Sequence, residues 1–428
     1  MYCRHVRIFC TPAVQHVLSN SCRWMPIVLH SQSHSCCNTS KISSHVIYFS
    51  PWRFLGTQVS YSLGNQNLKR ALFLHKWKFC QSVCQQRREI NTEGSRQNSQ
   101  VWEFNLQNPY GVISVQTHRA VEIDRIDVLE HPGGDYAAFQ LKESDSSTKA
   151  DGKGPVIEYD NAKNKLSLVE DNNKNLSSCG TWIISVPPYY DLAVHQVGDS
   201  IQGVQVKNLE NQSLTIIAMG DIHIHNIKSR DVTLDSKMGD VKSTKVLQGN
   251  AVVRTKKNKG FTADRLQGQK FDIKTEAGNV NCKDIYGNTS VFHSEEGSIQ
   301  LGNVTGECSV TTKGDVNIGS LDGSLKGQLN HTGSVEAYLV RPETVSLQTE
   351  NGNITLSLPT DVKGHLDLKA PKVSVSSELN FNFQKEDIKG QVKGILNAKG
   401  PTSITASSKE GSITVSMQSW FASLKLGS

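Results

Sequence analysis

Residues 278–298 read GNVNCKDIYGNTSVFHSEEGS and hold one full period of a repeat that runs through the second half of the chain. The segment opens on Gly-Asn and closes on Gly-Ser, and its two outer glycines, Gly278 and Gly297, lie 19 residues apart. Pairs of this kind recur at spacings of 17 to 21 residues. They are Gly220-Asp221, Gly239-Asp240, Gly278-Asn279, Gly297-Ser298, Gly314-Asp315, Gly333-Ser334 and Gly352-Asn353, with Gly260-Phe261 as the one departure and a weak continuation through Pro371-Lys372 and Gly390-Gln391 to Gly411-Ser412.

A second glycine series is interleaved with the first at nearly the same period. Its members are Gly249, Gly268, Gly287, Gly306 and Gly323, spaced 19, 19, 19 and 17 residues. Two series that share one period indicate a stack of similar structural units rather than a chance run of glycines.

Apolar and polar residues alternate between the glycines, as Ile222 and Ile224 do around His223. Alternation with period two is typical of half-buried strands. Short strands with glycine turns at a repeat of about 19 residues predict an all-β fold, a single-stranded β-solenoid resembling a parallel β-helix. A β-propeller is disfavoured because each blade needs about 40 residues. We expect the glycines at coil corners with positive φ, and the Asp, Asn or Ser after each glycine to bond turn amides.

The sequence divides into four predicted regions: a leader at 1–99, an irregular β lead-in or cap at 100–197, solenoid repeats at 198–417, and a C-terminal cap or tail at 418–428. Within the lead-in, strands are expected at 111–115, 121–124, 156–159, 166–169 and 182–186. A cap is expected because the end of a solenoid exposes unpaired strands. The apolar tail, with Trp420 and Phe421, suits a second cap or a partner-binding segment.

The charge distribution is uneven. The 428 residues carry a net charge of +6, yet residues 1–88 hold eleven basic side chains and no acidic one, which leaves 35 basic and 40 acidic groups in residues 89–428. Such a weakly acidic body disfavours a nucleic-acid-binding domain. No apolar run approaches the roughly 20 residues of a membrane-spanning helix, so no transmembrane segment is expected.

An acid-free, basic leader is typical of a mitochondrial transit peptide. The alternatives are an extension without any targeting role and a cytoplasmic protein. Seven of the ten cysteines lie in the first 84 residues, and Cys179, Cys282 and Cys308 are scattered through the body. These positions do not form a disulfide framework and favour a reducing compartment. His34, Cys36 and Cys37 lack a second ligand pair at zinc-finger spacing, so no zinc site is predicted.

Asp221, His223 and His225 would project from the same face of one strand and could supply metal ligands. Because neighbours on one face of a strand lie about 7 Å apart, a solvated face is the preferred interpretation. Corner residues after the glycines would stack in one column, for which turn chemistry is preferred over metal binding. This column contains Asp221, Asp240, Asn279, Ser298, Asp315, Ser334 and Asn353.

The remaining charged clusters, Glu295-Glu296 and the run at 256–259, are expected in turns, where charges are usually solvated. The sequence contains neither a phosphate-binding loop nor a nucleophile elbow nor a His-Glu-x-x-His motif. We therefore predict no catalytic, cofactor-binding or metal-binding residue and no cofactor.

The segment 184–194, Ile-Ser-Val-Pro-Pro-Tyr-Tyr-Asp-Leu-Ala-Val, leads from a strand ending in Val-Pro into the glycine-punctuated repeats. With Gly220-Asp221-Ile222, Gly239-Asp240-Val241 and Gly314-Asp315-Val316, it resembles the adhesin-like β-solenoid domain family of unknown function, which is common in bacteria. The resemblance covers about residues 100–417 and implies a β-solenoid without a catalytic motif. With its leader, the whole chain is similar to a vertebrate protein of this domain type.

These observations predict a non-enzymatic interaction or scaffold protein with an unidentified protein partner, imported into mitochondria. The alternative is a β-helix protein that binds or cleaves glycans. Solenoids of either kind offer long, rigid faces to a ligand.

Overall fold

The computed structural model describes residues 99–106, 108–126, 135–143, 155–170, 180–198, 201–384 and 390–417. All of them belong to one compact unit, Val83–Ser428. The leader residues 1–98, with His34, Cys36 and Cys37, lie outside the described ranges, as do Cys179 and the tail at 418–428.

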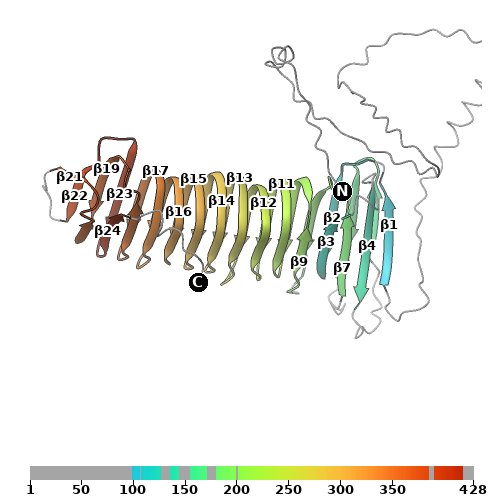
Figure 1. Cartoon of the computed structure of the whole chain (residues 1–428). Coiled ribbons are helices and arrows are strands. Elements are labelled where there is room, and N and C mark those ends of the chain that lie inside the picture. Colours follow the sequence, from blue (N-terminus) through green and yellow to red (C-terminus); the bar gives the residue numbers. More distant parts are fainter. Residues whose placement is uncertain are drawn as a thin grey trace, which may run out of the picture. The chain divides into compact units, whose positions relative to one another are not determined.

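The regular structure of the described residues is entirely β-strand, arranged as one 24-stranded sheet that winds into coils (Figure 1). The prediction of an all-β solenoid is confirmed. Within these ranges no helix is long and apolar enough to cross a membrane.

The centre of the stack consists of long strands that each form one coil. Each strand pairs in parallel with the next, and the pairing of Ile222 with Val241 reproduces the 19-residue period of the sequence. These strands are β11(Ile222–Ser236), β12(Val241–Thr255), β13(Phe261–Thr275), β14(Val280–Ser294), β15(Ile299–Thr312), β16(Val316–Leu329) and β17(Val335–Thr349).

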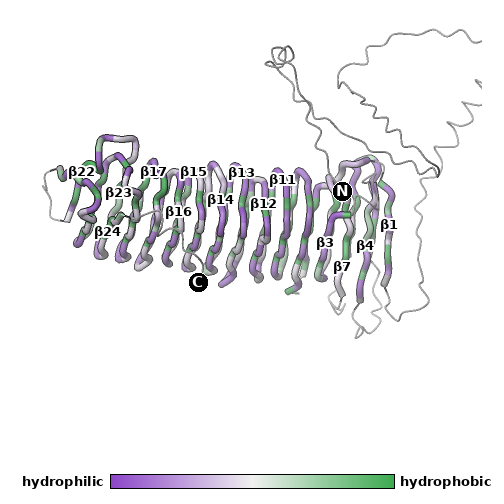
Figure 2. Tube along the Cα trace, in the orientation of Figure 1, coloured by the Kyte–Doolittle hydropathy of each residue, from purple (hydrophilic) through white to green (hydrophobic). Residues whose placement is uncertain are grey.

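Most of these strands bend near the middle, where the pairing register shifts; in β11 the shifts lie between His225 and Ile227 and between Lys228 and Asp231. The bend divides each coil into two straight halves, so the stack has two faces with a core between them. Ile222 and Ile224 enter the core from one half, and Val232 and Leu234 enter it from the other. Figure 2 shows the resulting alternation of polar and apolar residues along the strands. Each such buried side chain stabilises the fold by about 1.5–3 kcal/mol.

Corner glycines and buried hydroxyl groups connect successive coils. The Ser236 hydroxyl donates to the Gly220 carbonyl at 2.8 Å and accepts from the Gly239 amide at 2.9 Å. Thr349 makes the same pair of bonds to Gly333 and Gly352.

The positive φ expected at these corners is not found at the first-series glycines from Gly220 to Gly352, although Gly390 of the weak continuation has it. Positive φ occurs instead at Gly249, Gly306 and Gly323 of the second series. The corner glycines are required by close approach, because a Cβ on Gly352 would lie 1.7 Å from the Gly333 carbonyl oxygen.

At the N-terminal end, the coils do not stack in chain order. The strands β8(Asp191–Gln196) and β9(Val204–Lys207) adjoin β10(Glu210–Ala218) and β11. The next layer outward is β2(Val112–Thr117) and β3(Ala120–Arg125), and beyond it lie β6(Lys165–Val169) and β7(Gly180–Val186). The coil that comes first in the chain is therefore inserted between two later ones. The five strands predicted in the lead-in are all present, the one at 156–159 as β5(Val156–Asp160).

The C-terminal end repeats this arrangement. β17 and β18(Ile354–Leu358) pair with β23(Thr402–Ser408) and β24(Ser412–Met417), the last strands of the described chain. The earlier strands β19(Gly364–Lys369) and β20(Lys372–Val375) lie on the outer side of that coil. The weak continuation of the glycine series predicted that the corner at position 371 stacks on the corner at Gly352. This order is wrong, because Gly411 stacks on Gly352.

Hydrogen bonding explains why the last coil takes the inner place. The Gly411 amide donates to Ser408, and Ser408 donates to the Gly352 carbonyl, each at 2.9 Å. Pro371 has no amide hydrogen to donate, so it cannot replace Gly411 at this corner.

Antiparallel strands terminate the parallel stack at both ends. β4(Tyr136–Glu143) pairs with β7, β1(Ser99–Asn105) with β4, and β5 with β6. At the opposite end β22(Gln391–Leu396) pairs with β19, and β21(Phe381–Gln384) with β22. These strands cover parallel edges that would otherwise accept another chain.

Candidate functional site

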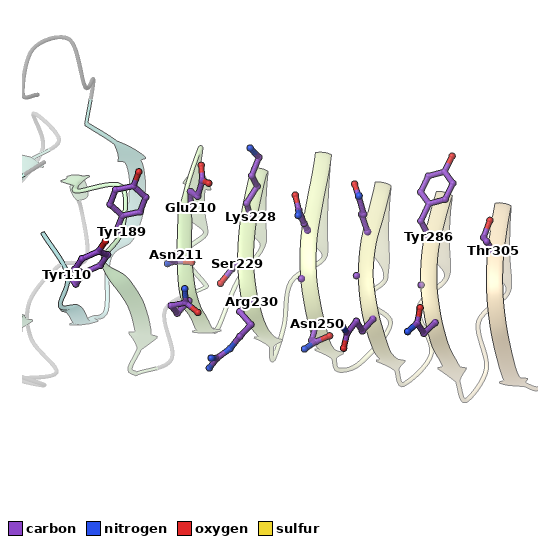
Figure 3. Close-up of a pocket in the computed structure, with 18 residues that line it drawn as sticks. Tyr110, Tyr189, Glu210, Asn211, Lys228, Ser229, Arg230, Asn250, Tyr286 and Thr305 are labelled. Carbon is purple, nitrogen blue, oxygen red and sulfur yellow. The ribbon is translucent and has the colours of Figure 1, made fainter. Parts of the chain in front are cut away.

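A groove of about 980 Å³ follows the bent edge of the stack, where the two halves of each coil meet (Figure 3). It begins at turns that carry Tyr110 and Tyr189 and crosses the six coils from β10 to β15. Because parallel coils are spaced by about 4.8 Å, these coils span about 24 Å along the stack.

The second glycine series forms the floor of this groove. Gly249, Gly268 and Gly287 lie there in one column, and a Cβ on Gly268 would meet the Gly249 carbonyl oxygen at 2.2 Å. Gly268 and Gly287 are partners in the parallel ladder. The floor is therefore free of side chains, and its strands are already paired with one another.

Polar side chains form the two walls. One wall is a column in pairing register, Glu210, Lys228, Gln248, Gln267, Tyr286 and Thr305. The other wall contains Arg230, Asn250, Gln269 and Asn288. Figure 3 shows Lys228 and Tyr286 projecting on one side of the floor, and Arg230 and Asn250 on the other.

Four wall amides have no protein partner within the described ranges: Gln248, Gln267, Gln269 and Asn288. Asn250 differs, because it donates to Asp231 at 3.1 Å and accepts from the Lys270 amide at 3.3 Å. Each of the four amides can therefore both donate to and accept from a ligand.

Asn211 lies in the groove near its N-terminal end and is only 9% exposed. Its Nδ2 donates to the carbonyls of Tyr190 and Ser213, both at 3.1 Å. Its Oδ1 is buried without a hydrogen-bond partner in the described part of the chain. A buried acceptor of this kind is costly unless a donor reaches it.

Exposed tyrosines occupy the end and one wall of the groove. The rings of Tyr110 and Tyr189, which are 65% and 50% exposed, have centroids 5.8 Å apart. The adjacent Tyr190 is buried, and its hydroxyl donates to the Asn108 carbonyl at 2.7 Å. Burial raises the pKa of Tyr190 well above its usual range. Tyr286 is 44% exposed and stands farther along the wall.

Charged groups gather at one end of the groove. Glu210, Lys228 and Arg230 lie near the tyrosine pair, and within the described part of the chain Glu210 is the only carboxylate that lines the groove. The remainder of the lining is neutral.

The histidines considered as metal ligands lie outside the groove. Asp221 and His223 are exposed, and the His225 Nδ1 lies 2.8 Å from the Thr244 hydroxyl, while Ile222 and Ile224 are buried. No group of three or more His, Cys, Asp or Glu side chains in the described residues could hold a metal ion.

The corner residues after the glycines were expected to bond amides of their own turns. In the structure they bond the amide of the corresponding corner in the next coil. Asp221 Oδ1 accepts from the Asp240 amide at 2.8 Å, and Asn279 Oδ1 accepts from the Ser298 amide at 2.9 Å. The column is therefore a structural element.

The two charged clusters noted in the sequence lie in turns and away from the groove. The Lys257 amide donates to a Glu276 carboxylate oxygen at 2.7 Å, and the Lys259 ammonium lies 3.4 Å from Asp240. Glu296 lies 4.0 Å from the Lys313 ammonium.

The second glycines lie at bends of the coils, as expected from the sequence, but the groove that follows these bends was not predicted. The residues on either side of each second-series glycine contain a pattern that indicates the groove. These tripeptides are Gln248-Gly249-Asn250, Gln267-Gly268-Gln269 and Tyr286-Gly287-Asn288. A polar residue on both sides of a recurring glycine places two columns of polar side chains beside a bare floor.

The chain is similar to several known proteins. The family described as Toastrack DUF4097 matches residues 177–416. A candidate adhesin from Bacteroides fragilis NCTC 9343 is 13% identical; the match covers 76% of this chain and 98% of that chain, with a TM-score of 0.27.

Two further solved structures are similar. A candidate lipid-binding protein from Parabacteroides distasonis ATCC 8503 is 10% identical, with 75% of this chain and 97% of that chain covered and a TM-score of 0.31. A candidate adhesin from Parabacteroides merdae ATCC 43184 is 9% identical, with 75% and 96% covered and a TM-score of 0.23.

Proposed function

The chain belongs to the Toastrack DUF4097 family, and from this premise we propose that it is a non-enzymatic binding module, a rigid β-solenoid that holds a partner in its groove. The observation that carries the proposal is the set of four wall amides above a glycine floor that have no protein partner among the residues that the structure describes. Side chains that only stabilise the stack bond to the next coil, as Asn250 does. Those four amides are open to a ligand instead.

The chemistry of the groove favours binding over catalysis. Cleavage of a glycosidic bond ordinarily needs two carboxyl groups on either side of the scissile bond, about 5–9.5 Å apart. Among the residues that the structure describes, Glu210 is the only carboxylate in the lining, and it lies at one end. Of the two candidate functions that involve glycans, binding therefore fits this groove better than cleavage.

We also propose that the chain resides in mitochondria, with the cytoplasm as the alternative. The support is the acid-free run of residues 1–88, whose eleven basic side chains suit import along the membrane potential. The test is a fluorescent fusion of residues 1–90, which we expect to colocalise with a mitochondrial dye. A fusion that stays diffuse in the cytosol would overturn this part of the proposal.

The test of groove-dependent binding is proximity labelling with the full-length chain in its native compartment. We would compare the native protein with the triple variant Gln267→Ala/Gln269→Ala/Tyr286→Ala. The matched control is Gln300→Ala, because Gln300 is an exposed glutamine on the outer face of β15 and lies outside the groove.

We expect a set of neighbours that disappears in the triple variant and persists in Gln300→Ala. Identical neighbours for all three proteins would show that the chain does not act through its groove. Circular dichroism of the purified variants checks that the stack remains folded.

A further inference from the structure

We propose that the groove binds a neutral, extended oligosaccharide lying along the stack with about one sugar ring per coil. This inference rests on the proposed binding function and names its class of ligand. Four features of the groove carry it: the wall amides, the coil spacing, the exposed tyrosines and the paired floor.

The wall amides match a ligand rich in hydroxyl groups. Gln248, Gln267, Gln269 and Asn288 each present a donor and an acceptor and have no protein partner in the described ranges. A sugar hydroxyl both donates and accepts, so it can satisfy either end of an amide. The neutrality of this central stretch gives no advantage to an anionic polymer such as a nucleic acid.

The geometry of the stack matches a sugar chain better than a peptide. The four amides lie on three successive coils, β12 to β14. These coils are spaced by about 4.8 Å, which is close to the length of one ring in an extended β-linked glycan. An extended peptide presents side chains to one face at about twice 3.3 Å, so its repeat would not keep step with the coils.

The tyrosines offer flat apolar surfaces next to polar atoms. Tyr286 stands in the wall between Gln267 and Thr305, and Tyr110 with Tyr189 closes the N-terminal end. Aromatic rings with a polar tip suit ligands that have one apolar face and a polar rim. The C–H face of a pyranose ring is such a surface.

The floor disfavours a peptide that adds as a strand. β-Strand addition needs an unpaired edge, whereas Gly268 and Gly287 already pair with each other in the ladder. The lining also lacks apolar pockets for peptide side chains, since Tyr110, Tyr189 and Tyr286 are its only large apolar groups.

The test is isothermal titration calorimetry of the full-length protein with hexasaccharides, one ring for each coil that the groove crosses. The probes are cello-, chito-, manno- and xylohexaose, which are neutral and β-linked, with maltohexaose as a neutral α-linked helix former and a heparin hexasaccharide as an anionic probe. We expect binding of at least one β-linked probe, and no binding of the other two through the groove.

Three variants locate the binding. Tyr286→Ala is expected to weaken the affinity at least about tenfold, and Gln267→Ala/Gln269→Ala at least about fivefold. Tyr286→Phe retains the ring and should stay within about threefold of the native protein, and Gln300→Ala within about twofold. Equal melting temperatures of the variants show that a lost affinity is not a lost fold.

The inference is overturned if no β-linked hexasaccharide binds, if only maltohexaose or heparin binds, or if the groove variants bind as the native protein does. Chromatography of the incubated sugars adds one further test, because release of shorter products would identify an enzyme and overturn the binding module itself. Groove-dependent protein neighbours without any sugar binding would leave the proposed function standing while overturning the ligand class.

Discussion

At each coil corner, the residue is determined by the coil next to it. The first-series glycines from Gly220 to Gly352 do not have positive φ. They leave free the space that a Cβ would fill, because backbone atoms of a neighbouring coil lie there. The serine or threonine that precedes the glycine then bonds both coils, as Thr349 does for Gly333 and Gly352. A corner thus combines a steric requirement with a hydrogen-bonding one.

Replacing Gly352 with alanine should destabilise the stack. The new Cβ would lie 1.7 Å from the Gly333 carbonyl oxygen, so the corners would have to separate, at a cost of about 1–3 kcal/mol or more. Gly203→Ala is the matched control, because its Cβ would meet its nearest neighbour, the Asp221 carbonyl oxygen, at 3.4 Å. Denaturant unfolding followed by circular dichroism compares the two variants, and an equal loss of unfolding free energy would contradict the steric explanation.

Cys282 and Cys308 are free thiols in the core, and burial raises the pKa of both, that of Cys308 to about 12. In the unfolded chain these thiols ionise near pH 8.5, while the folded state keeps them protonated. The unfolded state therefore binds fewer protons above that pH, and the free energy of unfolding falls as the pH rises, by up to about 1.4 kcal/mol per pH unit for each thiol.

The double variant Cys282→Ala/Cys308→Ala should have a shallower pH dependence of stability between pH 8 and pH 10. The measurement is denaturant unfolding under reducing conditions, with the slope against pH as the readout. Any cavity left by the substitutions shifts the curve by a constant amount and leaves its slope unchanged. Parallel curves for the two proteins would show that the thiols do not carry this dependence.

At the scale of the elements, alternation and period predicted the strands and their pairing over the centre of the stack. Ile354, Leu356 and Leu358 are buried as their spacing indicates. Such patterns are local, because inward and outward positions and turn residues follow from a few neighbouring residues.

The order of the end coils could not be predicted in the same way. Gly411-Ser412 repeats the corner chemistry of Gly352-Asn353, and the bond from the Ser412 amide to Asn353 connects residues 59 positions apart. A periodic signal shows which residues can occupy a corner but not which corner lies next to it. For the same reason, the tyrosines of the lead-in could not be placed at the groove from sequence.

Removing the last coil should release the coil beyond it. In a chain that ends at Gly400, β19 and β20 lose their parallel partners β23 and β24. We expect amide hydrogen exchange in Gly364–Lys369 and Lys372–Val375 to approach that of an unfolded segment, while β13 and β14 stay protected. If sequential stacking were correct, residues 364–375 would keep their protection, and that result would contradict the inserted topology.

At the scale of the whole molecule, positive and negative charge are distributed unevenly along the chain. Residues 1–88 carry eleven positive charges, and residues 89–428 carry a net charge of −5. Exposed ion pairs such as Lys283–Asp264 link neighbouring coils and add little stability each. The lining residues at the centre of the groove carry no charge, so the chain could bind a neutral ligand independently of salt and an anionic ligand in a salt-dependent way.

The salt dependence of binding should distinguish these modes. Affinity for a neutral β-linked hexasaccharide should change by less than about twofold between 50 and 500 mM NaCl, because no counterions are released. It should fall in Tyr286→Ala, whose ring lies in the groove wall. Any binding of heparin or DNA should instead fall steeply with salt, because it depends on the basic residues 1–88, and should be unchanged in Tyr286→Ala.

Calorimetry of both ligands at three salt concentrations makes the comparison. A sugar affinity that falls steeply with salt would show that charged groups, rather than the amides and tyrosines of the groove, hold the ligand.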